Sequence, residues 1–219
     1  MKAVVITIED NPKSIQSASR CIASAPYLKI KHHKAITPND DIEKLLEINK
    51  IKNLNHFKND TRYSRYERCL SAFLSHLYAW KDCIDNNEPT IIFEHDAVVV
   101  NQVPQFFKFN KVMTISKPSY GKFNVPNFLG SGPLVQKRYF GGAHGYIVSP
   151  SGAKELLKKA ETNAGPTDTF LNLDNFPFLQ EHNPWLVEAR DTFTTIQNER
   201  GCRAKDLSHM VEPNKYEII

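Results

Sequence analysis

The first 36 residues change from an apolar run to a capped segment and then to an alternating pattern. Residues 3–8 form an apolar run of strand length. Asn11 and Pro12 follow at once, and an Asn cap with Pro at the first helical position predicts a helix ending near residue 23. Residues 27–36 alternate as a second strand does. This succession predicts a βαβ unit, the usual start of an α/β domain.

The clearest helical pattern follows a polar stretch in the first third of the chain. Ser64 and Glu67 match a capping box, S-x-x-E. Apolar side chains then recur at helical spacing along one side, namely Leu70, Phe73, Leu74, Leu77 and Ile84. Two asparagines and a proline at 86–89 end this helix, and the apolar residues 90–93 predict a buried strand of the parallel-sheet kind.

Weaker patterns predict the remaining elements. They are a partly helical connection over 37–60 with a short helix at 41–49, strands over 111–115, 146–148 and 185–187, a loop or hairpin region over 117–140, a helix from the Ser149-Pro150 cap through 159, and a short helix within 165–171. Together these elements predict an α/β fold in a single domain over residues 1–219, with a mostly parallel sheet flanked by helices.

Composition narrows the functional class only slightly. The chain is 41% hydrophobic and 24% charged, as is usual for a soluble globular protein. A net charge of +4 fits an anionic ligand but does not establish nucleic-acid binding. The four cysteines form no C-x-x-C pair, which favours reduced thiols. Without a signal-peptide pattern or a run of about 18 apolar residues, the sequence predicts a cytoplasmic protein.

Three potential metal ligands interrupt the apolar stretch IIFEHDAVVV. In an extended chain, Glu94 and Asp96 point to one face and His95 to the other. Ligands of open α/β sheets bind at the carboxyl ends of the strands, and two carboxylates there suit Mg²⁺ or Mn²⁺. A strand end that simply turns into solvent explains the same triplet equally well.

The long helix carries a second candidate group. Arg65 and Arg68 lie in its first turn, with Arg62 just before, and a helix N-terminus with arginines favours a phosphate group. His76 and Trp80 continue the stripe that borders the apolar side, so His76 is placed to touch a diphosphate or a sugar. A solvated arginine face and a histidine at the edge of the core are the alternatives.

Two further features complete the candidates. Three glycines within five residues surround His144, and positions such as Gly142 let the backbone approach a ligand, although a tight turn has the same composition. Asp168 lies near a predicted helix start. It is either a general base toward a hydroxyl group or an acid that stabilises the first helical turn.

The order of these motifs resembles glycosyltransferase family 25, the group of bacterial lipooligosaccharide and collagen galactosyltransferases. A βαβ start precedes C-L-S-x-x-L-S-H-L-x-x-W, then a strand ending in E-x-D, then G-x-x-x-x-Y-I-V-S-x-x-G-A-K-x-L-L and P-x-D. The resemblance covers roughly residues 2–171. It implies a GT-A-type, Rossmann-like fold, with residues 1–100 as the donor-binding half and 101–219 as the acceptor side. It also implies a nucleotide-sugar donor, usually UDP-linked, and a divalent metal.

The resemblance carries roles to individual positions. It implies Asp96 and Glu94 as metal ligands, with Asp96 the more direct one, Thr7 and Ile8 near the nucleotide base, Ser75, His76 and Trp80 at the donor site, and Asp168 as the base. Arg65, Arg68 or His76 would share the charge of the departing diphosphate. His95 stands where the family usually has a central acid, which makes metal dependence less certain.

The acceptor stays open between two classes. One is a glycan or glycolipid, and the final residues lack the basic amphipathic segment expected for work on a membrane-borne glycolipid. The other is 5-hydroxymethylcytosine in phage DNA, whose phosphate backbone the basic residues at 29–34 and 62–68 would contact. The enzyme would then act in the host cytoplasm. A hexosyl- or pentosyltransferase fits either class. The alternative to an enzyme is a degenerate module that binds a nucleotide sugar or a partner.

Overall fold

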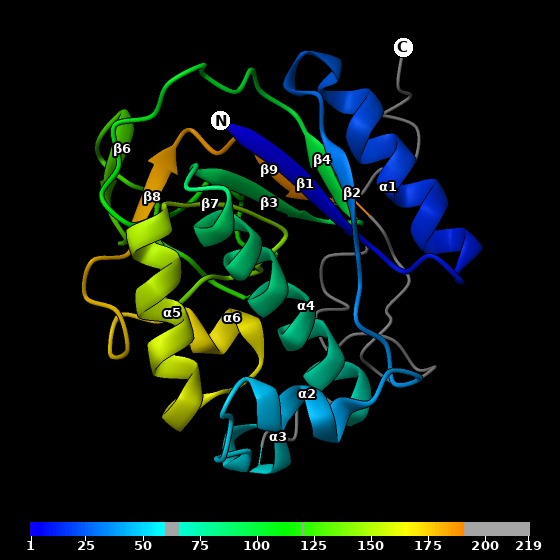
Figure 1. Ribbon diagram of the computed structural model, residues 1–219. Helices are drawn as coiled ribbons and strands as arrows, with labels where there is room; N and C mark the ends of the chain where they lie inside the picture. The colour runs from blue at the N-terminus through cyan, green and yellow to red at the C-terminus, as the bar shows by residue number, and fades with distance from the viewer. Residues whose placement is uncertain (60–65, 120, 191–219) are drawn as a thin grey trace.

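A computed structural model of the chain describes residues 1–59, 66–119 and 121–190. Arg62, Ser64 and Arg65, the predicted cap and two of the predicted phosphate-binding arginines, lie outside the described residues. The elements are, in order, β1 (Lys2–Thr7), α1 (Pro12–Ser24), the 3₁₀ helix η1 (Pro26–Leu28), β2 (Lys31–Lys34), α2 (Ile42–Ile48), α3 (Asn55–Asn59), α4 (Tyr66–Asp85), β3 (Thr90–Glu94), β4 (Ala97–Val99), β5 (Val112–Thr114), β6 (Gly130–Pro133), β7 (Gly145–Val148), α5 (Pro150–Asn163), α6 (Thr167–Phe170), β8 (Gln180–Asn183) and β9 (Val187–Ala189) (Figure 1).

Seven strands of the described chain form one sheet, in the order β2-β1-β3-β7-β5-β8-β6. β1 pairs in parallel with both β2 and β3. β7 enters antiparallel between β3 and β5, and β8 runs parallel to β5 but antiparallel to β6. The predicted α/β fold is confirmed, but the sheet is mixed rather than mostly parallel. An apolar run reveals that a strand is buried on both faces, whereas its direction depends on the connections around it.

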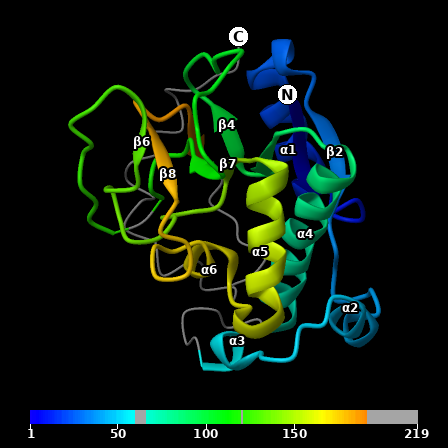
Figure 2. The same ribbon diagram turned by 60° about the vertical axis from the view of Figure 1, so that its left-hand side comes forward.

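Helices cover both faces of this sheet. α4 and α5 pack side by side over one face (Figures 1 and 2). The core beneath α4 includes Val4 and Ile92, while the core on the side of α1 includes Val5 and Phe93. Neighbouring residues of β1 and β3 therefore alternate between the two helix layers, as the pleat of a strand requires.

Two of the helix starts that the sequence predicts are formed as expected. The side chain of Asn11 accepts hydrogen bonds from two backbone N–H groups of the first turn of α1, at 3.0 and 3.3 Å. Ser149 Oγ accepts one from the backbone N–H of Gly152 at 3.1 Å, at the start of α5. Both helices begin with a proline, whose missing N–H needs no partner there.

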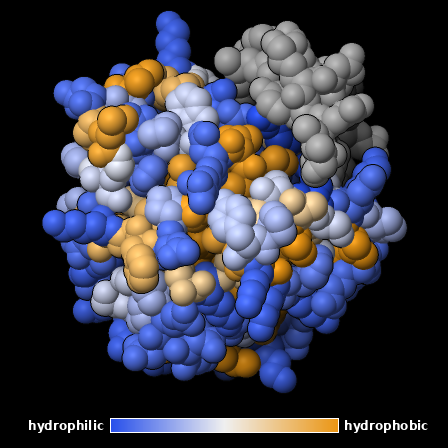
Figure 3. Space-filling view, turned by 90° about the horizontal axis from the view of Figure 1, so that it is seen from above, coloured by the Kyte–Doolittle hydropathy of each residue, from blue (hydrophilic) through white to orange (hydrophobic). Residues whose placement is uncertain are grey.

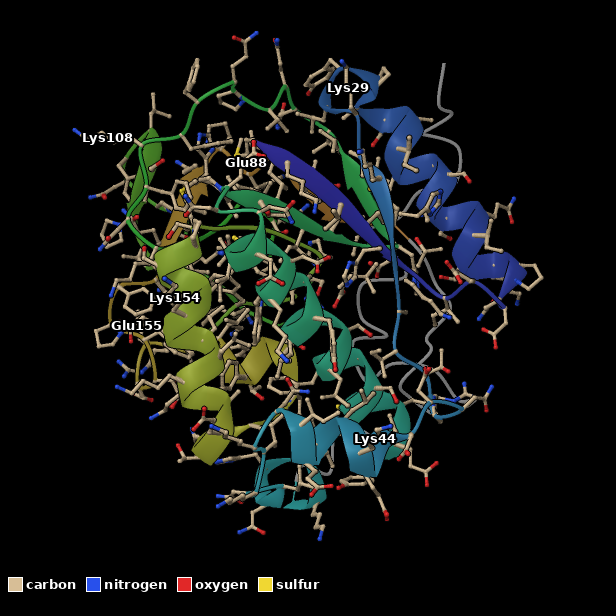
Figure 4. The ribbon with its side chains drawn as sticks, in the orientation of Figure 1. Lys29, Lys44, Glu88, Lys108, Lys154 and Glu155 are labelled. Carbon is tan, nitrogen blue, oxygen red and sulfur yellow. The ribbon has the colours of Figure 1, made fainter. Side chains whose placement is uncertain are left out.

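The outer helix faces are charged, as the amphipathic patterns require. Lys154 and Glu155 of α5 and Lys44 of α2 are exposed and lie at the periphery of the molecule (Figure 4). Viewed from above, most of the surface is hydrophilic, with hydrophobic residues exposed near the middle of this face and at several points of its margin (Figure 3). Most apolar residues of the helices are buried and belong to the two cores.

Three strands in the second half escape the sequence patterns. β6 has the sequence GSGP within the expected loop or hairpin region, and β8 has the polar sequence QEHN. β9 begins at Val187, where the predicted strand over 185–187 ends. β6 and β8 lie at the far edge of the seven-stranded sheet, and β9 pairs with β4 in a separate two-stranded sheet. These short strands bury few side chains, so they show neither alternation nor an apolar run.

Candidate active site

The parallel strands β1 and β3 end at one edge of the sheet, and the candidate residues gather there. Ile6 of β1 lies opposite Glu94, the last residue of β3. Thr7 follows Ile6, and the backbone N–H of Ile8 donates to Ser14 Oγ of α1 at 2.9 Å. Carboxyl ends of parallel strands are where ligands bind in open α/β sheets.

Glu94 lies at the carboxyl end of β3, in contact with a buried histidine. Its Oε1 atom is 3.1 Å from His76 Nε2 of α4. The Glu94 side chain is 34% exposed, whereas that of His76 is only 2% exposed. Burial raises the pKa of Glu94 to about 7. Burial also lowers the pKa of His76 to about 4, and the charge of Asp168 opposes that shift.

A tyrosine that the sequence analysis did not single out completes this contact. Tyr146 Oη of β7 lies 2.9 Å from His76 Nδ1 and accepts a hydrogen bond from Trp80 Nε1 at 2.8 Å. Both ring nitrogens of His76 are therefore engaged, and the histidine lies behind Glu94 in a supporting position. A hydroxyl group within the buried strand GYIV was the available signal, because a buried tyrosine hydroxyl needs a partner.

His95 and Asp96, the other two potential metal ligands of this segment, interact with residues of α1. His95 Nδ1 lies 3.0 Å from Ser14 Oγ. Burial, followed by the charge of Asp96, raises the pKa of the Cys21 thiol in α1 to about 12, against an opposing effect of Arg20. The chain turns at His95 and Asp96, so the extended geometry that would point Glu94 and Asp96 the same way is interrupted.

These residues do not form a metal site in the described part of the chain. Within it, no group of three or more His, Cys, Asp or Glu side chains is arranged to hold an ion. Glu94 Oε1 contacts His76 of α4, and the charge of Asp96 raises the pKa of Cys21 in α1. A Mg²⁺ or Mn²⁺ ion needs several converging oxygen ligands, so the predicted metal ligation by Glu94 and Asp96 stays a prediction.

The glycine-rich segment brings Asp168 to the same region. Asp168 Oδ1 accepts a hydrogen bond from the backbone N–H of Ala143 at 2.8 Å. Gly142 has a φ of +133°, and a Cβ atom there would approach His144 Nδ1 to 2.4 Å, so the tight path requires glycine. His144 is buried, and burial lowers its pKa to about 4, against a hydrogen bond to the backbone of Lys117. Glycine at position 142 permits this backbone path, and the backbone N–H of the next residue, Ala143, binds Asp168.

The remaining predicted residues are spread around this edge. Thr7 is buried, with its Oγ1 atom 2.9 Å from His32 Nδ1. Ser75 is also buried, and its hydroxyl accepts a hydrogen bond from the backbone N–H of Ile36 at 2.8 Å. Arg68 is exposed in the first turn of α4. Thr7 and Ser75 therefore join elements together, and their predicted contacts with a donor stay predictions.

A pocket of about 160 Å³ lies beside α6, adjoining the segment that carries Asp168. The described residues that line it offer amide, hydroxyl and imidazole groups, without a carboxylate, lysine or arginine. They are His56, Asn163, Gly165, Thr169, Phe170, Asn172 and Asn175.

Comparison with known proteins agrees with this arrangement. Residues 5–171 match the model of glycosyltransferase family 25, described as LPS biosynthesis protein. Because this match covers well over half of the sequence, the chain belongs to glycosyltransferase family 25. The expected family is confirmed, as is a glycosyltransferase class in general terms, and the mixed α/β sheet agrees with the GT-A-type fold expected of it.

Two other comparisons add little to the family match. No curated protein matches the sequence. One of the similar solved structures is that of a glycosyltransferase involved in the glycosylation of the major capsid of PBCV-1, with 10% identity, a TM-score of 0.40, and coverage of 96% of this chain and 98% of that chain. In residues 1–59, 66–119 and 121–190, no helix has the length and apolar character needed to cross a membrane.

Proposed function

We propose that the protein transfers a sugar from a nucleotide-sugar donor to a hydroxyl group of an acceptor glycan, and a UDP-sugar is the favoured donor. Family membership supports the reaction class. The observation that carries the proposal is the pair Glu94 and Asp168 around the buried His76, at the edge where β1 and β3 end. The predicted donor half and acceptor half would meet there, since β7 and α6 belong to the second half of the chain.

Asp168 is the proposed general base. It would accept the proton of the acceptor hydroxyl as that oxygen bonds to the sugar C1 atom and the bond from C1 to the diphosphate oxygen breaks. Its Oδ1 atom accepts a hydrogen bond from the Ala143 N–H, which ties Asp168 to the glycine-rich segment beside the strand end. If the base lies on the face of the sugar opposite the leaving group, the anomeric centre inverts.

Glu94 is proposed to bind the donor. Its partial exposure at the strand end and its contact with His76 leave one carboxylate oxygen to accept a hydrogen bond from a hydroxyl group of the nucleotide sugar. No step of this proposal passes through a metal ion. Donor hydrolysis with and without Mn²⁺ tests the metal dependence that the family implies.

A glycan is the favoured acceptor for two reasons. The family description refers to LPS biosynthesis, and the pocket beside α6 offers amide, hydroxyl and imidazole groups that suit the hydroxyls of a sugar. Hydroxymethylated DNA carries a dense negative charge, which this pocket does not complement. Acceptor affinity that falls steeply with added salt would reverse this choice in favour of DNA.

Donor hydrolysis tests the proposal without an acceptor. The protein would be incubated with a panel of hexose and pentose nucleotide sugars, with and without Mn²⁺, and free nucleoside diphosphate would be measured. We expect hydrolysis of one donor, strongly reduced but still measurable in Glu94→Gln and retained in Glu155→Gln, which removes a carboxylate from the outer face of α5. Absence of both hydrolysis and binding for every donor would instead favour the non-catalytic module.

A further inference from the structure

The side chains of Trp80, Tyr146, His76 and Glu94 form a continuous row of hydrogen-bonded groups from the core to the strand end. The separations are 2.8 Å from Trp80 Nε1 to Tyr146 Oη, 2.9 Å from Tyr146 Oη to His76 Nδ1, and 3.1 Å from His76 Nε2 to Glu94 Oε1. The first three side chains are buried, and only Glu94 reaches solvent.

The direction of each hydrogen bond follows from the first. An indole N–H only donates, so Trp80 gives its proton to Tyr146 Oη. Among the described residues, the other partner of that hydroxyl is His76 Nδ1. The buried tyrosine proton therefore goes to His76 Nδ1, since otherwise it would have no acceptor. Neutral His76 then carries its own proton on Nε2 and donates it to Glu94 Oε1.

We propose that Tyr146 is a positioning residue of the transferase, which acts on the donor through His76 by fixing the orientation of the Glu94 carboxylate. The hydroxyl of Tyr146 sets the tautomer of His76, and the Nε2–H of His76 holds Glu94 Oε1. The second oxygen, Oε2, is then presented to a hydroxyl group of the nucleotide sugar. This inference rests on the proposed function, because it gives Glu94 a ligand to orient.

The register of the sheet supports a specific rather than a general packing role. Tyr146 lies between Ile92 of β3 and Thr114 of β5, each of which pairs with it directly. Thr114 Oγ1 is buried too, but it contacts the backbone of Gly145 and Ser116 and not His76. Two buried hydroxyls therefore lie side by side in the sheet, and only one of them belongs to the row that ends at Glu94.

The experiment compares Tyr146→Phe with Thr114→Val. Both variants delete one buried hydroxyl, but only the first breaks the row. The nitrogen NMR spectrum of the His76 ring reports which nitrogen carries the proton. We expect the Nε2–H form in all three proteins, since Glu94 still accepts from Nε2, and a shifted signal of the unprotonated Nδ1 in Tyr146→Phe alone, because that nitrogen loses its hydrogen-bond donor. An unchanged His76 spectrum in Tyr146→Phe would overturn the inference.

Kinetics give the second measurement. With the donor that the wild type hydrolyses, we expect kcat to fall about 10–100-fold in Tyr146→Phe and KM to stay within about twofold, as for loss of an orienting partner. Thr114→Val should retain kcat. In a Glu94→Gln background, Tyr146→Phe should cause no further loss, because the two act as one unit. An equal further loss in that background would contradict a role through Glu94.

These outcomes separate the inference from the proposed function. If the wild type binds and hydrolyses no nucleotide sugar, the proposed function fails, and the His76 spectrum alone then decides whether Tyr146 orients the row. If the wild type is active and Tyr146→Phe keeps both its spectrum and its kcat, the inference fails while the proposed function stands.

Discussion

The two faces of the central sheet are built from different kinds of side chain. On the α4 face, Phe73, Trp80 and Phe170 lie with ring centroids 5.2–5.8 Å apart. On the α1 face, most core residues are small or aliphatic, such as Ala18, Cys21 and Val5, with Phe93 as a fully buried ring. Both faces are well buried, and in the described part of the chain the α4 face encloses the row of hydrogen-bonded groups from Trp80 to Glu94.

This difference indicates a division of labour between the faces. Large rigid rings fill space around His76 and Tyr146 and keep water away, and hydrogen bonds in such surroundings are stronger and better oriented. On the α1 face, helix α1 packs against β1 and β4. The α4 face should therefore govern activity and stability together, whereas the α1 face should govern stability alone.

The largest expected effect concerns the candidate base on the α4 side. Asp168→Asn keeps the size of the side chain and an oxygen for Ala143 N–H, but it removes the proton acceptor. We expect the rate of sugar transfer to fall about 10²–10⁴-fold without loss of the fold. Transfer assays with Asp174→Asn, a change at an exposed residue, provide the control. A transfer rate within about twofold of the wild type would exclude Asp168 as the base.

Phenylalanine deletions compare the faces directly. Phe73→Ala on the α4 face and Phe93→Ala on the α1 face each remove a fully buried ring, so each should lower the free energy of unfolding by about 3–5 kcal/mol. Only Phe73→Ala should also reduce kcat of the folded protein, because Phe73 packs against Phe170 of α6, next to Asp168. Urea unfolding and kinetics at low temperature measure the two effects. Equal losses of kcat in both variants would contradict the division between the faces.

A smaller effect is expected at the start of α1. Ser14 Oγ accepts the Ile8 N–H and lies 3.0 Å from His95, so it joins α1 to the ends of β1 and β3. Ser14→Ala should lower the free energy of unfolding by about 1–3 kcal/mol, because it leaves a buried N–H without its acceptor. Ser19→Ala, at an exposed position of the same helix, should change it by less than about 0.5 kcal/mol. Similar values for the two variants in denaturant titrations would remove Ser14 from this role.

The last prediction is a pH dependence that distinguishes Glu94. Because the pKa of Glu94 is raised from 4.5 to about 7, the folded protein keeps a proton that the unfolded chain loses between these values. Stability of the wild type relative to Glu94→Gln should therefore decline as the pH rises from about 4.5 to about 7, and then level off. Thermal unfolding across this range measures the difference between the two proteins. A stability of the wild type that increases with pH relative to Glu94→Gln would contradict a raised pKa of Glu94.

The buried histidines make the comparison with Glu94→Gln necessary. Burial lowers the pKa of His76 and of His144 to about 4, so the unfolded chain takes up protons first as the pH falls. Their contribution to stability is lost between about pH 6.5 and pH 4, in the opposite direction to that of Glu94. The profile of the wild type alone therefore mixes the two signs.

The first half of the fold follows closely from local sequence patterns. β1, α1 and β3 coincide with the predicted elements because each combines a cap or an apolar run with a clear end. The direction of β7 and the presence of β6 and β8 depend on pairings between distant segments, which no local period encodes.

The candidate site was predictable by residue type but not by contact. The sequence identified Glu94, His76 and Asp168, and the structure brings them to one edge. Local spacing could not reveal that Tyr146, seventy positions after His76, would become its partner. Nor could it reveal that the chain would turn at His95 and Asp96, directly after Glu94.

The antiparallel insertion of β7 makes the site sensitive to strand register. Tyr146 faces the α4 side and Ile147 the α1 side, opposite Ile92 and Ile91 of β3. A slip of one residue would exchange these two faces, leaving the tyrosine hydroxyl among aliphatic side chains and His76 against a methyl group. A single inserted or deleted residue between Gly141 and Tyr146 should therefore abolish the alignment of His76 and Glu94, even where every residue of the site is still present.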